Sequence, residues 1–175
     1  IGALYVRSGV RFKGGQMGGG QENNLRSGTT NVPGIMALDN SCSIYTANHD
    51  EYFSNMSAVK HRLFNNLIRI RDVRLNGPEI DKGVPYILNV SFLGVRGEVL
   101  LNSLMDKGLL VSTGSACAAR LRGKNRVLTA MGIIGDRQDG AIRFSFSPFN
   151  TVEEADTAAQ YIEDSLNRLR RFRRR

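Results

Sequence analysis

The residues best suited to chemistry lie in a loop of small side chains, residues 112–119, which holds Cys117, one of only two cysteines. No large side chain in this loop could shield the sulfur, and the flanking Ser and Gly residues leave the backbone free to swing it between two positions. Such a loop could deliver a thiol as a nucleophile. The alternative is a Ser/Gly turn with an incidental cysteine, and the spacing alone favours it, because a lone cysteine is usually a small buried apolar residue.

Arg143 is the second residue that could do chemistry. It is the one charge in an otherwise apolar and hydroxyl-bearing run, residues 141–146. Alternation along that run predicts a strand with its apolar side chains on one face and Arg143 on the other. A short apolar run at residues 109–111 predicts another strand, which leads straight into the Cys117 loop.

Helices must position these candidates, and the apolar spacing predicts three long ones. The first begins at Asn31 as its cap with Pro33 in its first turn, the second covers residues 50–71, and the third follows a capping box at residues 151–154. Their apolar side chains recur every three or four residues, so we expect these faces, Cys42 included, to lie in the core. The faces comprise Ile35, Leu38, Cys42 and Tyr45; Met56, Val59, Leu63, Leu67 and Ile70; and Ala155, Ala158, Ile162, Leu166 and Leu169.

Strands and breaks complete the pattern. We expect a buried strand at residues 3–6, a break at Asn76-Gly77-Pro78, and a strand at residues 87–92 with Leu88, Val90 and Phe92 on one face. A shorter helix should cover residues 98–107 and end at Gly108. This order of elements predicts an α+β fold, in which helices and a sheet form a small sandwich.

The composition limits the class of protein. With 175 residues and 41% hydrophobic content, the chain is long enough for one domain or one and a fraction. No apolar run is long enough to cross a bilayer, and two cysteines cannot form a disulfide framework, which favours a reducing, cytoplasmic setting. The chain begins without Met or a charged leader, so we expect it to be a piece of a longer protein.

The net charge of +8 would suit a nucleic-acid ligand, but its distribution argues against one. Six arginines of the last eight residues supply all but two of these charges, there is no Trp, and no basic stripe alternates with aromatic residues. We expect this tail to be a solvated, frayed helix end whose cations suit the helix dipole. These arginines are Arg168, Arg170, Arg171, Arg173, Arg174 and Arg175.

Separated motifs occur in the order and at the spacing of one known family. They are GGGQE at residues 18–22, LRSGTTNVPG at 25–34, ILNVSF at 87–92, GE at 97–98, VSTGSAC at 111–117, VLTAMG at 127–132 and IRFS at 142–145. Over nearly the whole chain the sequence resembles the pyridoxal-phosphate-dependent cysteine desulfurases of the NifS/IscS type. These form a branch of the class-V aminotransferase family of fold type I.

The resemblance implies a role for three residues. Cys117 matches the thiol that attacks the sulfur of L-cysteine and keeps it as a persulfide, while L-alanine is released. Arg143 matches the arginine that binds the substrate α-carboxylate, for which a planar guanidinium is well suited. Thr29 matches a threonine that reaches the pyridoxal phosphate of the neighbouring subunit, which implies a homodimer. A sulfur-acceptor or scaffold protein would be a further partner.

The resemblance also implies how the chain is divided. The lysine to which the cofactor attaches would precede Ile1, as would the family's histidine that stacks on the cofactor ring, so neither His49 nor His61 takes that role. Residues 1–48 would be a remnant of the large domain with the interdomain helix, and residues 49–175 the C-terminal small domain. We therefore expect the chain by itself to be inactive and to lack the yellow colour of the bound cofactor.

Two alternatives stay open. The chain could belong to a class-V relative with another substrate, such as a selenocysteine lyase or an aminotransferase, in which Cys117 is accessory. It could also be a non-catalytic interaction domain that binds partners through its basic tail. Turnover that does not need the thiol would support the former, and salt-sensitive binding lost on deleting residues 168–175 would support the latter.

Overall fold

The computed structural model describes residues 1–113 and 125–172, so Cys117 lies outside the described residues. These residues form two compact units, Ile1–His49 and Asp50–Arg175, each described here by itself. The division falls one residue from the expected boundary. Assignment of the two units to a large-domain remnant and a small domain stays a prediction.

The first unit consists of loops followed by helix α1 (Val32–Ala47). Asn31 caps α1 as predicted, because its side-chain oxygen accepts a hydrogen bond from the backbone N–H of Gly34 at 3.0 Å. The helix has no buried residue, and Cys42 is exposed. The expectation that Cys42 lies in the core is therefore wrong, because within this unit nothing covers the apolar face of the helix.

The strand expected at residues 3–6 is also absent, and Leu4 and Tyr5 are 71% and 86% exposed. A strand exists only where another strand pairs with it. The described part of this unit forms a single isolated bridge, between Gln16 and Arg26. The apolar run at residues 3–6 therefore has no neighbour to pair with.

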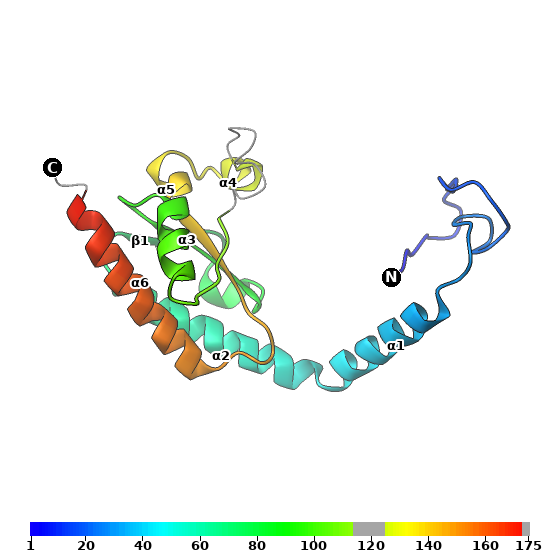
Figure 1. Cartoon of the computed structure of the whole chain (residues 1–175), viewed down its shortest axis with the longest axis horizontal. Coiled ribbons are helices and arrows are strands. Elements are labelled where there is room, and N and C mark those ends of the chain that lie inside the picture. Colours follow the sequence, from blue (N-terminus) through cyan, green and yellow to red (C-terminus); the bar gives the residue numbers. More distant parts are fainter. Residues whose placement is uncertain (114–124, 173–175) are drawn as a thin grey trace. The chain divides into compact units, whose positions relative to one another are not determined.

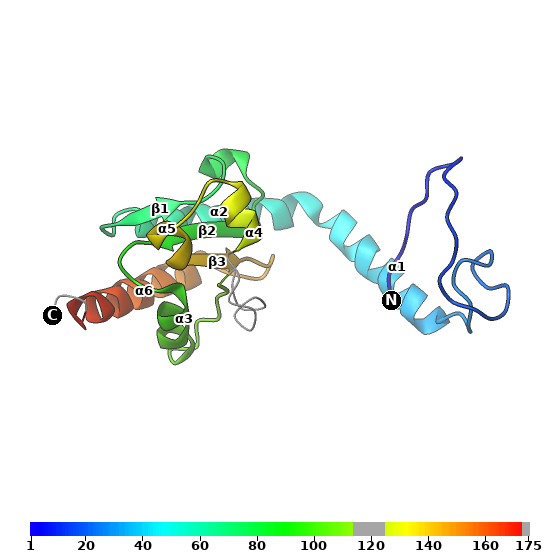
Figure 2. The same ribbon diagram turned by 90° about the horizontal axis from the view of Figure 1, so that it is seen from above.

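The second unit mixes helices with an antiparallel sheet in the order β1-β2-β3, which confirms the predicted α+β fold. The sheet comprises β1 (Val73–Leu75), β2 (Ile87–Phe92) and β3 (Ala141–Ser145). Figures 1 and 2 show α2, α3 and α6 on one side of it and α4 and α5 on the other. The helices are α2 (His49–Leu67), the 3-10 turn η1 (Ile80–Lys82), α3 (Gly97–Met105), α4 (Arg126–Ala130), α5 (Asp136–Asp139) and α6 (Val152–Phe172).

The core lies between the sheet and helices α2, α3 and α6. As expected, the apolar positions of β2 point into it, together with Ile142 and Phe144 of β3. The capping box starts α6 as predicted: the Thr151 hydroxyl accepts from the Glu154 N–H at 3.2 Å, and the Glu154 carboxylate accepts from the Thr151 N–H at 3.1 Å. Fully buried core residues include Leu63, Leu67, Leu88, Val90, Phe92, Leu100, Leu104, Ile162 and Leu166.

The arginine-rich helix end is exposed as expected at Arg168, but the expectation is wrong at Arg170, which is half-buried. Arg168 donates from Nη2 to the hydroxyl of Ser103 at 2.7 Å, and half-buried Arg170 donates from Nη2 to the carbonyl of Leu93 at 3.2 Å. Burial lowers the pKa of Arg170. Long side chains can lay their stems over a domain surface, so a run of arginines is not always a solvated face.

Candidate functional site

Arg143 lies in the middle of β3 on the face of the sheet turned away from the core. Its neighbours Ile142 and Phe144 are buried on the opposite face, whereas Arg143 is exposed. Within the part of the chain that the structure describes, its guanidinium makes no hydrogen bond or ion pair. Among residues 1–113 and 125–172 the position therefore presents a cation without a partner, which is what recognition of a carboxylate requires.

Ser112, at the start of the Cys117 loop, pairs with Arg143. The Ser112 N–H donates to the Arg143 carbonyl at 3.1 Å, and the Arg143 N–H donates to the Ser112 carbonyl at 2.7 Å. The strand expected at residues 109–111 is thus wrong in extent, because the described part of this segment forms one isolated bridge, at Ser112.

A buried polar network joins the strands beside Arg143. The Arg137 guanidinium donates to the side-chain oxygen of Asn76 at 3.0 Å, and the Asn76 amide donates to the side-chain oxygens of Asn89 and Ser91, each at 2.7 Å. Asn89 is the residue of β2 directly opposite Arg143. These polar residues were not predicted as site residues. Asn89 was a signal in the sequence, because it is a polar residue between the apolar Leu88 and Val90 of an expected strand.

Thr29 belongs to the first unit and lies in the exposed loop before α1. Its carbonyl accepts from Arg26 Nη1 at 3.3 Å, and Arg26 also lies 4.0 Å from the Glu22 carboxylate. The motif around it is held by Ser27, whose hydroxyl donates to the Gly19 carbonyl at 2.7 Å. This hydrogen bond ties the glycine run to the loop that carries Thr29 and leaves the Thr29 side chain exposed.

Gly18 and Gly28 both adopt backbone conformations that favour glycine. Gly18 has a φ of +149°, and a Cβ atom there would lie 2.9 Å from the Cβ of Ser27. The backbone N–H of Gly28, at φ +103°, donates to the side chain of Gln21 at 3.2 Å. GGGQE and RSGT are therefore two halves of one loop structure.

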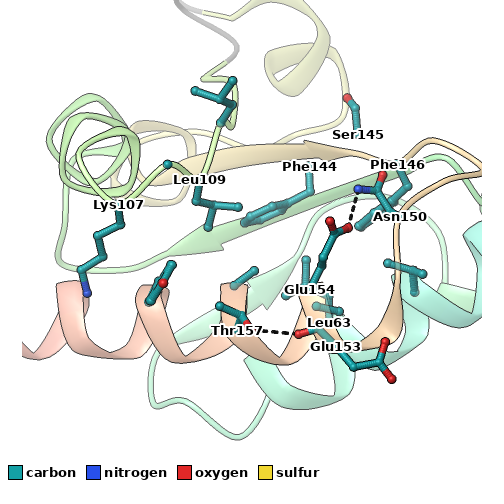
Figure 3. A pocket seen from close by; sticks show the side chains of 16 residues that line it. Leu63, Lys107, Leu109, Phe144, Ser145, Phe146, Asn150, Glu153, Glu154 and Thr157 are labelled. Carbon is teal, nitrogen blue, oxygen red and sulfur yellow. Dashed lines mark hydrogen bonds between the residues drawn. The ribbon is translucent and has the colours of Figure 1, made fainter.

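A pocket of about 520 Å³ lies on the core side of β3, between the sheet, α6 and the turn after α3 (Figure 3). Its wall includes Phe144 but neither Arg143 nor Ser112. Asn150 donates to the Glu154 carboxylate at 2.8 Å and, with the Thr151 N–H, lowers the pKa of Glu154. The pocket is therefore separate from the face that carries Arg143.

The described residues offer no site for a metal ion, because in residues 1–113 and 125–172 no three His, Cys, Asp or Glu side chains gather. No helix within these ranges is long and apolar enough to cross a membrane. The residues that could hold a phosphorylated cofactor are of the right kind: an exposed threonine hydroxyl on a glycine-containing loop suits a phosphate. An exposed arginine suits a carboxylate.

Comparisons with known proteins find relatives over almost the whole chain. Cysteine desulfurase IscS from Pectobacterium atrosepticum is 40% identical over 172 residues, and cysteine desulfurase IscS 1 from Archaeoglobus fulgidus is 34% identical over 171; each alignment covers 97% of this chain. The chain spans 42% and 44% of these relatives, less than half of their length.

The fold has close counterparts among solved structures. A NifS-like protein superposes with a TM-score of 0.83 at 35% identity, covering 94% of this chain and 42% of its own. The cysteine desulfurase CsdA from Escherichia coli superposes with a TM-score of 0.67 at 21% identity over 85% of this chain and 34% of its own, which supports the fold. Residues 1–157 match the family model of class-V aminotransferases, and the chain therefore belongs to that family.

Proposed function

We propose that this chain serves in a pyridoxal-phosphate-dependent cysteine desulfurase, in which Cys117 takes the sulfur of L-cysteine and L-alanine is released. The observation that carries the proposal is the pairing of Ser112 with Arg143. It sets the start of the Cys117 loop beside an exposed arginine whose guanidinium has no hydrogen bond or ion pair among the residues that the structure describes. The similarity to proteins named cysteine desulfurase supports the same reaction.

Arg143 would bind the substrate α-carboxylate through two parallel charge-assisted hydrogen bonds and so fix the orientation of the amino acid. Thr29 would contribute its hydroxyl to the phosphate of pyridoxal phosphate bound by a neighbouring subunit in a homodimer. When bound, the cofactor supplies an electron sink for the electron pair of the substrate's carbon–sulfur bond.

Cys117 would act as its thiolate. A new sulfur–sulfur bond forms between Cys117 and the substrate sulfur while the carbon–sulfur bond of the substrate breaks. The substrate carbon takes up a proton, and the amino acid leaves as L-alanine. The persulfide on Cys117 then passes its outer sulfur to an acceptor protein, for which a small-residue loop is suited. The scarcity of cysteines supports a reducing, cytoplasmic setting.

The test is the mass of the peptide that contains Cys117 after the full-length protein has been incubated with L-cysteine and pyridoxal phosphate. We expect a gain of one sulfur atom, and we expect Cys117→Ser to abolish alanine release while the cofactor still binds. Cys42→Ser is the matched control, because Cys42 lies on α1 in the first unit. Alanine release that persists in Cys117→Ser would instead favour a class-V relative in which the thiol is accessory.

A further inference from the structure

Asn89, the residue of β2 opposite Arg143, is the subject of an inference that rests on the proposed function. Arg143 uses both its backbone N–H and its carbonyl to pair with Ser112, and the carbonyl of Asn89 accepts from the Asn76 N–H at 2.9 Å. Asn89 and Arg143 thus face each other as a pair without mutual backbone hydrogen bonds. In such pairs the Cα atoms are only about 4.5 Å apart and the side chains are closest.

The orientation of the Asn89 amide follows from its hydrogen bonds. A guanidinium only donates, so the atom of Asn76 that Arg137 Nε contacts at 3.0 Å must be the oxygen. The nitrogen of Asn76 therefore points the other way, and the atom of Asn89 that it contacts at 2.7 Å must again be an oxygen. Asn89 is left with its NH₂ group unengaged within the described residues.

Two further contacts hold this chain of hydrogen bonds in place. Arg137 Nη2 donates to the carbonyl of Leu75 at 2.6 Å, and the Asn76 amide also donates to the Ser91 hydroxyl at 2.7 Å. Asn76 and Ser91 are 6% and 0% exposed. Reversing the Asn76 amide would set its nitrogen against the Arg137 guanidinium with no acceptor between them, and a buried donor without a partner is costly.

We propose that Asn89 is a second binding residue for the substrate carboxylate, and that Arg137 and Asn76 are positioning residues that fix its amide. With its only oxygen turned toward Asn76, Asn89 offers Arg143 no acceptor with which to pair. Its NH₂ group adds donors beside the guanidinium. Side by side, the Arg143 and Asn89 side chains therefore present donors alone, which complements a carboxylate, an acceptor at both oxygens.

The experiment measures the affinity of the full-length protein, with pyridoxal phosphate bound, for L-alanine by calorimetry, and KM and kcat for L-cysteine. We expect Asn89→Ala to weaken L-alanine binding and to raise KM about 10-fold, the lower range for a hydrogen bond to a charged group, with a smaller change in kcat. Asn89→Asp should weaken binding further, because its carboxylate would pair with Arg143.

Asn76→Asp tests the positioning role without touching the substrate. An aspartate keeps an oxygen toward Arg137 but presents only acceptors, so Asn89 must turn its nitrogen toward residue 76 and its oxygen toward Arg143. We expect about a 10-fold loss of affinity for L-alanine, comparable to that of Asn89→Ala. Asn102→Asp on the exposed face of α3 is the matched control, because it makes the same change of charge away from the sheet.

The outcomes separate the inference from the function on which it rests. If Arg143→Lys loses L-alanine affinity while Asn89→Ala, Asn89→Asp and Asn76→Asp behave like Asn102→Asp, the role of Asn89 is overturned and the proposed function stands. If L-alanine does not bind and Arg143→Lys matches the unmodified protein in KM, the proposed role of Arg143 is overturned as well. Thermal melting of each variant identifies any that fail to fold. If Asn76→Asp fails to fold because position 76 is buried, Asn89→Asp at half-buried position 89 still tests the role of Asn89.

Discussion

The two compact units differ in what they bury. In Ile1–His49 only Ser27 is buried, and the apolar residues of α1 face outward. In Asp50–Arg175 the described residues include a continuous core between the sheet and helices α2, α3 and α6. Both units carry apolar residues at helical spacing, so the difference shows that periodicity selects a face, whereas burial requires a second surface to cover it.

The largest difference should come from truncating equivalent apolar side chains. Leu166→Ala on α6, where Leu166 is 0% exposed, should lower the free energy of unfolding by about 2–5 kcal/mol, because a cavity adds to the lost transfer free energy. Ile35→Ala on α1, where Ile35 is 43% exposed, should change it by less than about 0.5 kcal/mol. Urea unfolding of this chain measures both, and equal effects would contradict the contrast between the units.

The second effect concerns a buried charge in the larger unit. Lys60 is 3% exposed and donates to the carbonyls of Ile80 and Val84 at 3.0 and 2.9 Å. Lys60→Met should destabilise the unit by about 1–3 kcal/mol, because both carbonyls lose a donor. Thermal melting at neutral pH measures the loss.

The pH dependence of stability provides a control for Lys60→Met. Burial lowers the pKa of Lys60 below its ordinary 10.5, so the folded state disfavours the proton that the unfolded state still binds. This cost is fully present below the folded pKa and is relieved as the pH rises toward 10.5. The unmodified chain should gain this contribution on going to alkaline pH, and Lys60→Met should not. The same pH dependence in both proteins would exclude Lys60 as its source.

A smaller effect should distinguish the two helix caps. Thr151→Ala should cost the larger unit about 1 kcal/mol, because α6 loses its capping hydroxyl. Asn31→Ala should shorten α1 without moving the main melting transition, since α1 buries nothing. Melting followed by circular dichroism separates the two, and a shift of the main transition by Asn31→Ala would show that the units unfold together.

The capping box of α6 should also make the stability of the larger unit depend on pH in the acidic range. Hydrogen bonds from Asn150 and from the Thr151 N–H hold the pKa of Glu154 below its ordinary 4.5, so its contribution is present above 4.5 and is lost as the pH falls through the folded pKa. Glu154→Gln should flatten that part of the stability profile. If stability falls as steeply with acid in Glu154→Gln as in the unmodified chain, other carboxylates cause that pH dependence.

The smallest effect is expected at Cys42. Because its side chain is exposed on α1, Cys42→Ser should change the free energy of unfolding by no more than about 0.5 kcal/mol. In a Cys117→Ser background, a thiol reagent should modify Cys42 in the native chain as fast as in urea. Protection in the native chain would show that its face is covered.

The sequence alone predicted elements that local chemistry specifies. The cap at Asn31, the capping box at Thr151 and the alternation along β2 and β3 each depend on residues close in the chain, and each is confirmed. Strand β1 was missed, because three residues are too few for a periodic signal. The motifs also identified the family, and they selected Cys117, Arg143 and Thr29, whose roles stay predictions.

Tertiary structure decided what depends on distant residues. Whether residues 3–6 form a strand, whether Cys42 is buried and whether arginines of α6 reach the domain surface all depend on a partner surface, which a local pattern does not contain. The polar network joins Asn76, Asn89 and Arg137, which come from different elements, and only the antiparallel register sets Asn89 against Arg143. Local spacing determined which face each residue takes, and strand pairing determined which neighbours share that face.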